Sequence, residues 1–103
     1  MLEILTLSVN NAGFGEFHTT LEASEELIEK IFAVNVKGPI FLTQAAIPHM
    51  TSGGRIINIS SVASKLGLQY LPIYGASKAA LDGLSYTWAQ EVTLFFTFSN
   101  IIC

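Results

Sequence analysis

Two short apolar segments, each followed by a helical pattern, constrain the fold of this chain most strongly. Residues 3–9 (EILTLSV) and 55–60 (RIINIS) are rich in aliphatic and β-branched residues, and the second resembles a buried parallel strand. Apolar residues at helical spacing follow the first segment over about 24–36 and 38–49, and the second over about 73–90. This strand–helix–strand–helix order predicts an α/β fold with a parallel sheet and right-handed crossovers.

Local signals suggest where these elements begin and end. Ser24, followed by acidic residues, predicts a helix N-cap, because negative charge is favourable at a helix start. Gly38-Pro39 interrupts the first helical pattern and predicts a kink. TSGG at 51–54 predicts a turn, and residues 61–72 a loop.

The composition excludes several classes of protein. The chain has 103 residues, which is at most one domain, and a net charge of -3 that offers no basic stripe for nucleic acid. Every apolar run is shorter than the roughly 18 residues needed to cross a bilayer. The first residues, MLEILTLSVNN, lack the basic region and the small-residue cleavage site of a secretory signal, and the single cysteine, Cys103, cannot form an internal disulfide. We therefore expect a reducing compartment, the cytoplasm.

The chain is also unusually apolar, with 50% hydrophobic and only 13% charged residues. A parallel sheet needs cover on both faces and more than two strands. These observations predict that the chain is the central βαβα portion of a larger, doubly wound sheet. Its apolar surfaces would then be covered by the rest of that domain.

Tyr74 and Lys78 are four residues apart, so they share one face of the predicted helix over 73–90. A free tyrosine, with a pKa of about 10, is a poor general base near neutral pH, and a nearby ammonium favours the phenolate. A pair of this spacing is either a solvated pair on a helix or a partly desolvated acid/base pair. The spacing alone does not separate the two.

Two further features lie at the edge of the predicted sheet where its strands end, and a third lies within the first helical pattern. Ser60 and Ser61 follow the second strand, where they either satisfy loop backbone groups or face a ligand. NNAG at 10–13 closes the first strand as a turn. Pro39 has no N–H, so the carbonyl of Asn35 loses its helical donor, which is either an ordinary kink or a site for a water molecule.

Together these motifs resemble the short-chain dehydrogenase/reductase family over residues 2–92. VNNAG (9–13) is similar to the family segment after its fourth strand, and NVKG (35–38) to its helix asparagine. RIINISS (55–61) is similar to its fifth strand with the active serine. YGASK (74–78) fits the YxxxK motif, and Ser61 precedes Tyr74 by the family's usual thirteen residues.

The resemblance implies a partial Rossmann-like domain and NAD(P)-dependent hydride transfer between a carbonyl and an alcohol. Tyr74 would be the acid/base, Lys78 would favour its phenolate and bind the nicotinamide ribose, and Ser61 would hold the substrate carbonyl. Asn35 would hold a relay water through its main-chain carbonyl. Asn11, Ala12 and Gly13 would line the ribose side of NAD or NADP.

The resemblance also implies a small-molecule carbonyl or alcohol substrate and a homo-oligomer formed through the helices at 38–49 and 73–90. From the residues themselves we expect no metal, nucleic-acid or membrane partner, because the chain has no Cys/His cluster, no basic stripe and no apolar run long enough to cross a bilayer. Leu66, Leu68, Tyr70 and Leu71 suggest an apolar wall for the substrate.

The sequence departs from the family in three places. The glycine-rich turn that binds the cofactor pyrophosphate is absent, because G-F-G at 13–15 lacks a third glycine at the required spacing. Thr6-Leu7-Ser8 reads as an insertion that displaces the register of the first strand. Residues 93–103 form a divergent tail that suits either a strand or an apolar, aggregation-prone segment.

We therefore expect residues 1–103 to be a single incomplete domain, inactive alone and without saturable NADPH binding. The hypothesis is that the chain is an incomplete gene model, a splice product or a fragment. The alternative function is a non-catalytic fragment that associates with full-length subunits. A serine hydrolase is disfavoured, because G-A-S-K-A (75–79) lacks the second glycine of a nucleophile elbow and no histidine follows Ser77.

Overall fold

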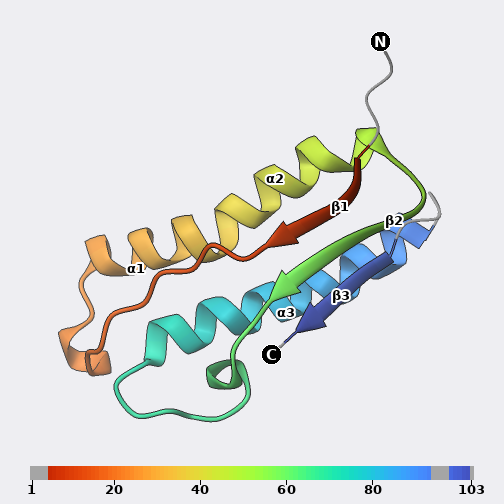
Figure 1. The fold of residues 1–103 in the computed structure, drawn as a ribbon. Helices are drawn as coiled ribbons and strands as arrows, with labels where there is room; N and C mark the ends of the chain where they lie inside the picture. Colours follow the sequence, from red (N-terminus) through yellow and green to blue (C-terminus); the bar gives the residue numbers. More distant parts are fainter. Residues whose placement is uncertain (1–4, 94–97, 103) are drawn as a thin grey trace.

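A three-stranded parallel sheet packs against helices in the computed structural model, which describes residues 5–93 and 98–102 (Figure 1). Strand β1 (Leu5–Asn10) pairs with β2 (Met50–Ile59), and β2 pairs with β3 (Phe98–Ile102). The strand order is β1-β2-β3. The prediction of an α/β fold with a parallel sheet is confirmed.

The third strand arises from the segment that suited either a strand or an apolar tail. Its backbone pairs with β2 from Arg55↔Phe98 to Ile59↔Ile102, and it lies against the long helix α3 (Pro72–Thr93). Of the two alternatives, residues 98–102 form the strand. Glu3, Ile4, residues 94–97 and Cys103 lie outside the described residues.

The first helical region is continuous but changes its geometry twice. Helix α1 (Glu25–Phe32) begins after Ser24, whose Oγ accepts a hydrogen bond from the N–H of Leu27 at 3.1 Å, so the predicted N-cap is confirmed. A π-helical turn, η2 (Ala33–Lys37), joins α1 to α2 (Gly38–Ala46). The predicted kink is thus a widened turn.

Two predicted boundaries were wrong. Helix α2 ends at Ala46 and is followed by a 3₁₀ turn, η3 (Ile47–His49), because Pro48 has no N–H with which to continue the α-helix. Residues 51–54, predicted as a turn, belong to β2. The pairing with β1 passes from Leu5↔Met50 directly to Leu7↔Arg55, so these four residues are extra length within β2, opposite Thr6.

The ladder between β1 and β2 is irregular near Thr6. Leu5 pairs with Met50, but Leu7 pairs with Arg55, after which the register is regular to Asn10↔Asn58. The irregular register therefore lies at Thr6–Ser8, the three residues that read as an insertion relative to the family.

One face of the sheet packs against the helices. Ile56 and Asn58 of β2 have no exposed surface, and Asn10 of β1 is buried beside them. The Asn10 Nδ2 donates to Asn58 Oδ1 at 2.6 Å and to Thr43 Oγ1 of α2 at 3.3 Å, while Asn58 Nδ2 donates to Ser85 Oγ of α3 at 2.6 Å. One buried polar network therefore joins β1, β2, α2 and α3.

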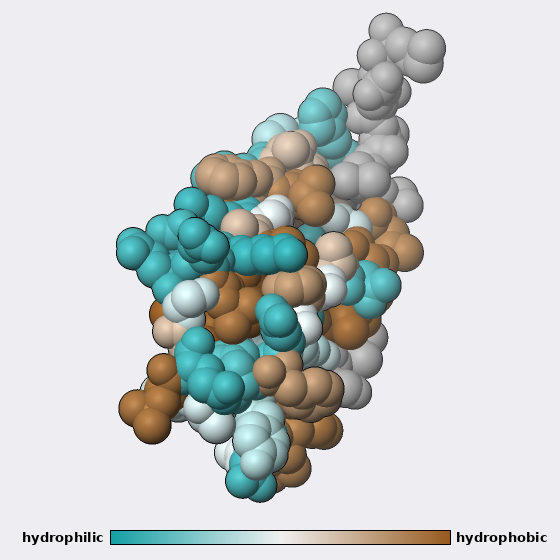
Figure 2. Space-filling view, turned by 90° about the vertical axis from the view of Figure 1, so that its left-hand side faces the viewer, coloured by the Kyte–Doolittle hydropathy of each residue, from teal (hydrophilic) through white to brown (hydrophobic). Residues whose placement is uncertain are grey.

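On the opposite face of β1, Leu7 and Val9 are 50% and 47% exposed. Large apolar side chains are also exposed on the helices and loops, and Figure 2 shows such patches between hydrophilic side chains at one end of the molecule. Within residues 5–93 and 98–102, no helix has the length and apolarity needed to span a membrane.

Candidate active site

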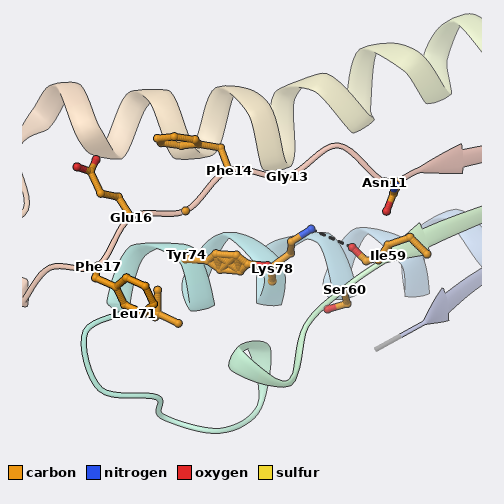
Figure 3. Close-up of a pocket in the computed structure, with 11 residues that line it drawn as sticks. Asn11, Gly13, Phe14, Glu16, Phe17, Ile59, Ser60, Leu71, Tyr74 and Lys78 are labelled. Atoms are coloured by element: carbon orange, nitrogen blue, oxygen red, sulfur yellow. Dashed lines mark hydrogen bonds between the residues drawn. The ribbon is translucent and has the colours of Figure 1, made fainter.

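A cavity of about 500 Å³ opens where β1 and β2 end (Figure 3). This volume is within the range of small-molecule sites. The carboxyl ends of parallel strands are where open α/β sheets bind ligands. Residues from the loop after β1, the end of β2 and the first turns of α3 line it, namely Asn11, Gly13, Phe14, Gly15, Glu16, Phe17, Ile59, Ser60, Leu71, Tyr74 and Lys78.

Lys78 is 3% exposed, and its Nζ donates a hydrogen bond to the carbonyl of Ile59 at 2.9 Å (Figure 3). Burial lowers the pKa of Lys78 from its ordinary value of 10.5, and the negative charge of Asp82, one turn further along α3, opposes this shift. The lysine is therefore a desolvated cation aimed at the cavity, and the alternative of a fully solvated helix pair does not describe it.

Tyr74 lies in the first turns of α3 and is half-buried. The Nζ of Lys78 is 5.9 Å from the centroid of its ring, so the predicted sharing of one helix face is confirmed. Pro72 begins this helix, where a residue without an N–H costs nothing. The phenol and the ammonium thus face the same cavity.

Ser61 caps the short 3₁₀ helix η4 (Val62–Ser64), and its Oγ accepts from the N–H of Ala63 at 3.1 Å. It is half-buried and is not among the described residues that line the cavity, whereas its neighbour Ser60 lines it. Accepting this bond leaves the Ser61 hydroxyl proton available as a donor. The structure therefore shows that Ser61 caps the backbone of η4, and its hydroxyl proton remains able to donate a hydrogen bond to a ligand.

Asn35 is completely buried in the π-helical turn η2, where the N–H of Gly38 bonds to the carbonyl of Ala33. Its side chain holds the loop after β1, because Oδ1 accepts from the N–H of Phe14 at 2.7 Å and Nδ2 donates to the carbonyl of Phe14 at 2.8 Å. Single π-helical turns within α-helices are frequent at functional sites.

Two of the three predicted ribose-side residues line the cavity. Asn11 and Gly13 lie on its wall, while Ala12 lines a neighbouring small pocket beside Val34 and Leu42. A Cβ on Gly13 would lie 3.3 Å from the Lys78 Nζ, which is a tight contact. Glycine at this position therefore lets the loop backbone approach the lysine closely.

Ser77 is a site residue that the sequence reasoning missed. It is fully buried, accepts from Asn35 Nδ2 at 3.0 Å, and donates to the carbonyl of Tyr74 at 2.7 Å. It thereby joins the π-helical turn to the helix turn that carries the tyrosine. The available signal was its position three residues after Tyr74, next to Lys78.

The sequence left two roles open for Ser60, satisfying loop backbone groups or facing a ligand. Its Oγ is buried at the cavity without a hydrogen-bond partner among the described residues. A buried hydroxyl of this kind is suited to bind a polar ligand. Across the described ranges, no cluster of three or more His, Cys, Asp or Glu side chains could hold a metal ion.

Gly75 allows α3 to approach the segment after β2 closely, at Ala63. A Cβ at this position would lie 2.7 Å from the carbonyl oxygen of Ala63, whereas a Cβ on Gly83, also in α3, would meet no atom within 4 Å. We expect Gly75→Ala to lower the free energy of unfolding by about 1–3 kcal/mol, because it forces two backbones apart. Gly83→Ala should raise it by about 0.5–1 kcal/mol, through helix propensity.

Urea denaturation followed by circular dichroism measures both changes on the same helix. Equal stabilisation by the two substitutions would show that α3 does not contact the loop at Ala63. A lower free energy of unfolding in Gly75→Ala, together with a higher one in Gly83→Ala, would support the contact between α3 and Ala63.

Comparison with known proteins agrees with this geometry. The model of the short chain dehydrogenase family matches residues 1–95. The short-chain dehydrogenase/reductase FrzI of Cladobotryum sp is 40% identical over 88 residues, covering 85% of this chain and 34% of that protein. An uncharacterized oxidoreductase of Thermotoga maritima is 40% identical over 101 residues, covering 96% of this chain and 40% of that protein.

Among solved structures, the angucycline C-6 ketoreductase LanV with bound NADP has a TM-score of 0.91 and 33% identity. The similarity covers 95% of this chain and 38% of LanV. This chain therefore spans about two fifths or less of the length of these three proteins. On the match to the family model and the shared fold, the chain belongs to the short-chain dehydrogenase family.

Proposed function

We propose that this site serves NAD(P)-dependent hydride transfer between a small carbonyl compound and the corresponding alcohol. The observation that carries the proposal is the desolvated Lys78, held by the Ile59 carbonyl beside the ring of Tyr74 in a cavity at the sheet edge. Family membership makes the chain part of an oxidoreductase family, and LanV is a relative with bound NADP.

The residues present fit one end of such a cofactor. The cavity contains a buried ammonium, a buried Ser60 hydroxyl that has no partner among the described residues, and a loop backbone at Gly13, where an added Cβ would lie 3.3 Å from the Lys78 Nζ. Asn11, Gly13, Tyr74 and Lys78 would hold the nicotinamide ribose, with Ala12 supporting the loop. The bound cofactor would supply the hydride to the carbonyl carbon in reduction, or accept it in oxidation.

The chain's own residues would move the proton. In reduction, the Tyr74 hydroxyl donates its proton to the carbonyl oxygen as the carbon gains the hydride, so that an alcohol and a phenolate result. The ammonium of Lys78 stabilises that phenolate. Ser61 donates a hydrogen bond that holds the carbonyl, and the main-chain carbonyl of Asn35 holds a water that returns a proton to the site.

A chimera tests this function. Residues 5–92 would replace the matching segment of LanV, and NADPH consumption would be measured with a panel of cyclic ketones. We expect reduction that depends on Tyr74. A folded chimera that binds NADPH and reduces none of the ketones would contradict the proposal.

The 103 residues on their own are expected to show no saturable NADPH binding, because they contain no glycine-rich turn for the pyrophosphate. A titration of NADPH fluorescence against the purified chain measures this. Binding with micromolar affinity would overturn the expectation, while the LanV chimera serves as the positive control.

A second candidate function is association with full-length subunits of the same family without catalysis. The exposed apolar side chains of α2 and α3 favour it, since Phe41, Leu42 and Tyr86 are 62%, 58% and 64% exposed. Mixing the chain with an intact relative should then lower that enzyme's activity, and Phe41→Asp should abolish the inhibition. Unchanged activity across a concentration series would exclude this role.

A further inference from the structure

The loop segment Phe14–His18, which we call the strap, crosses the face of the Tyr74 ring. A Cβ built on Gly15 would lie 2.5 Å from Tyr74 Cδ1, 3.0 Å from Cγ and 3.2 Å from Cε1. The Gly15 hydrogen that such a Cβ would replace therefore points at the ring. No other residue type fits this position without moving the tyrosine or the strap.

The first end of the strap is fixed by Asn35. Both backbone groups of Phe14 bond to the buried Asn35 side chain, at 2.7 and 2.8 Å. The Phe14 ring turns toward α1, where the Lys30 Nζ lies 4.4 Å from its centroid (Figure 3). The residue that precedes Gly15 thus cannot shift without breaking three contacts.

The other end is fixed by His18, which is 6% exposed. The backbone N–H of His18 donates to the carbonyl of Tyr70 at 2.9 Å. Tyr70 adopts a left-handed backbone conformation with φ of 68°. The His18 Nδ1 lies 2.7 Å from the carbonyl of Glu16 and must be the donor there, because a carbonyl only accepts. The strap therefore has an internal hydrogen bond, from His18 to Glu16, and a second bond to the loop before α3, at Tyr70.

Between these ends, the side chains of the strap turn away from the tyrosine. Figure 3 shows Glu16 directed toward α1 and Phe17 lying beside Leu71, which leaves the backbone of Gly15 against the Tyr74 ring. In the first turns of α3, Ser77 donates to the Tyr74 carbonyl and accepts from Asn35. Asn35 thus fixes both the strap that contacts the ring and the helix turn that carries the tyrosine.

We propose that Gly15 is a positioning residue that sets the place of the Tyr74 phenol in the site. The catalytic consequence rests on the proposed function, whereas the contact itself does not. Enlarging Gly15 by one methyl group must displace the ring or lift the strap. Because a misplacement of about 1 Å can cost about 100-fold in rate, we expect Gly15→Ala to lower kcat by about 10- to 100-fold.

Nuclear magnetic resonance of the 103-residue chain tests the contact directly. The ring current of Tyr74 should shift one Gly15 Hα resonance upfield. Tyr74→Phe, which keeps the ring, should retain the shift, and Tyr74→Leu should abolish it. A Gly15 Hα resonance at its ordinary position in the unsubstituted chain, or an upfield shift that survives Tyr74→Leu, would overturn the proposal.

Kinetics of the LanV chimera test the consequence. Gly15→Ala should lower kcat by a larger factor than it raises the KM for NADPH, because Asn11, Gly13 and Lys78 are left in place to hold the cofactor. Gly67→Ala is the matched control, because a Cβ at Gly67 meets no atom within 4 Å. Equal effects of the two substitutions, or an unchanged kcat in Gly15→Ala, would contradict the positioning role. An inactive parent chimera with the upfield shift intact would contradict the proposed function and leave the contact established.

Discussion

Replacement of Tyr74 by phenylalanine is expected to lower kcat/KM of the LanV chimera for ketone reduction by about 100- to 10,000-fold, the usual contribution of a positioned general acid. The ring and its packing against the Gly15 backbone remain, since only the hydroxyl is removed. The loss would therefore report proton transfer rather than a change of fold.

The control for this variant is Tyr86→Phe. Tyr86 lies on the same helix, is 64% exposed, and is not among the described residues that line the cavity. We expect Tyr86→Phe to retain full activity, and both variants to keep the affinity of the parent chimera for NADPH within a few-fold. A Tyr74→Phe chimera within about threefold of its parent would remove Tyr74 from the chemistry, since general acid–base catalysis is worth far more.

Replacement of Asn58 by alanine is expected to lower the free energy of unfolding by about 2–4 kcal/mol, which is a large fraction of the stability of a small domain. Asn58 is fully buried and bonds to both Asn10 and Ser85, which lie on different elements. Removing it withdraws a partner from each of two buried polar groups at once.

A double-mutant cycle makes this prediction specific. Asn58→Ala, Ser85→Ala and the double variant would be compared by urea denaturation, with the exposed Gln44→Ala as a control expected to change stability by less than about 0.5 kcal/mol. A coupling energy of about 1 kcal/mol or more is expected for the Asn58–Ser85 contact. Additive effects would show that α3 is not held to β2 through this bond.

The elements that the sequence predicted well are those specified by local patterns. The Ser24 cap depends on residues within three positions, and the shared face of Tyr74 and Lys78 follows from helical periodicity. Pro39 identified the irregular turn at Asn35, although its π-helical form could not be read from the sequence.

The features that were missed depend on contacts between distant segments. The Asn35 side chain binds Phe14, 21 residues earlier, and Ser77, 42 residues later, and no local pattern encodes either bond. The turn predicted at 51–54 was wrong for a related reason, because these residues are extra length within β2, between its paired residues Met50 and Arg55. The contact of Gly15 with Tyr74 likewise appears only when the loop after β1 meets α3.

The roles assigned to the site residues share one consequence, which is that a hydride and a proton reach the same carbonyl group. Transfer of deuterium from NADPH that carries deuterium at both C4 positions of the nicotinamide, in the LanV chimera, tests this most directly. We expect one deuterium on the carbinol carbon of the product, and formation of this product at least about 100-fold more slowly in Tyr74→Phe. Reduced product without deuterium, or labelled product at equal rates in both chimeras, would contradict the assignment of this site to hydride transfer assisted by Tyr74.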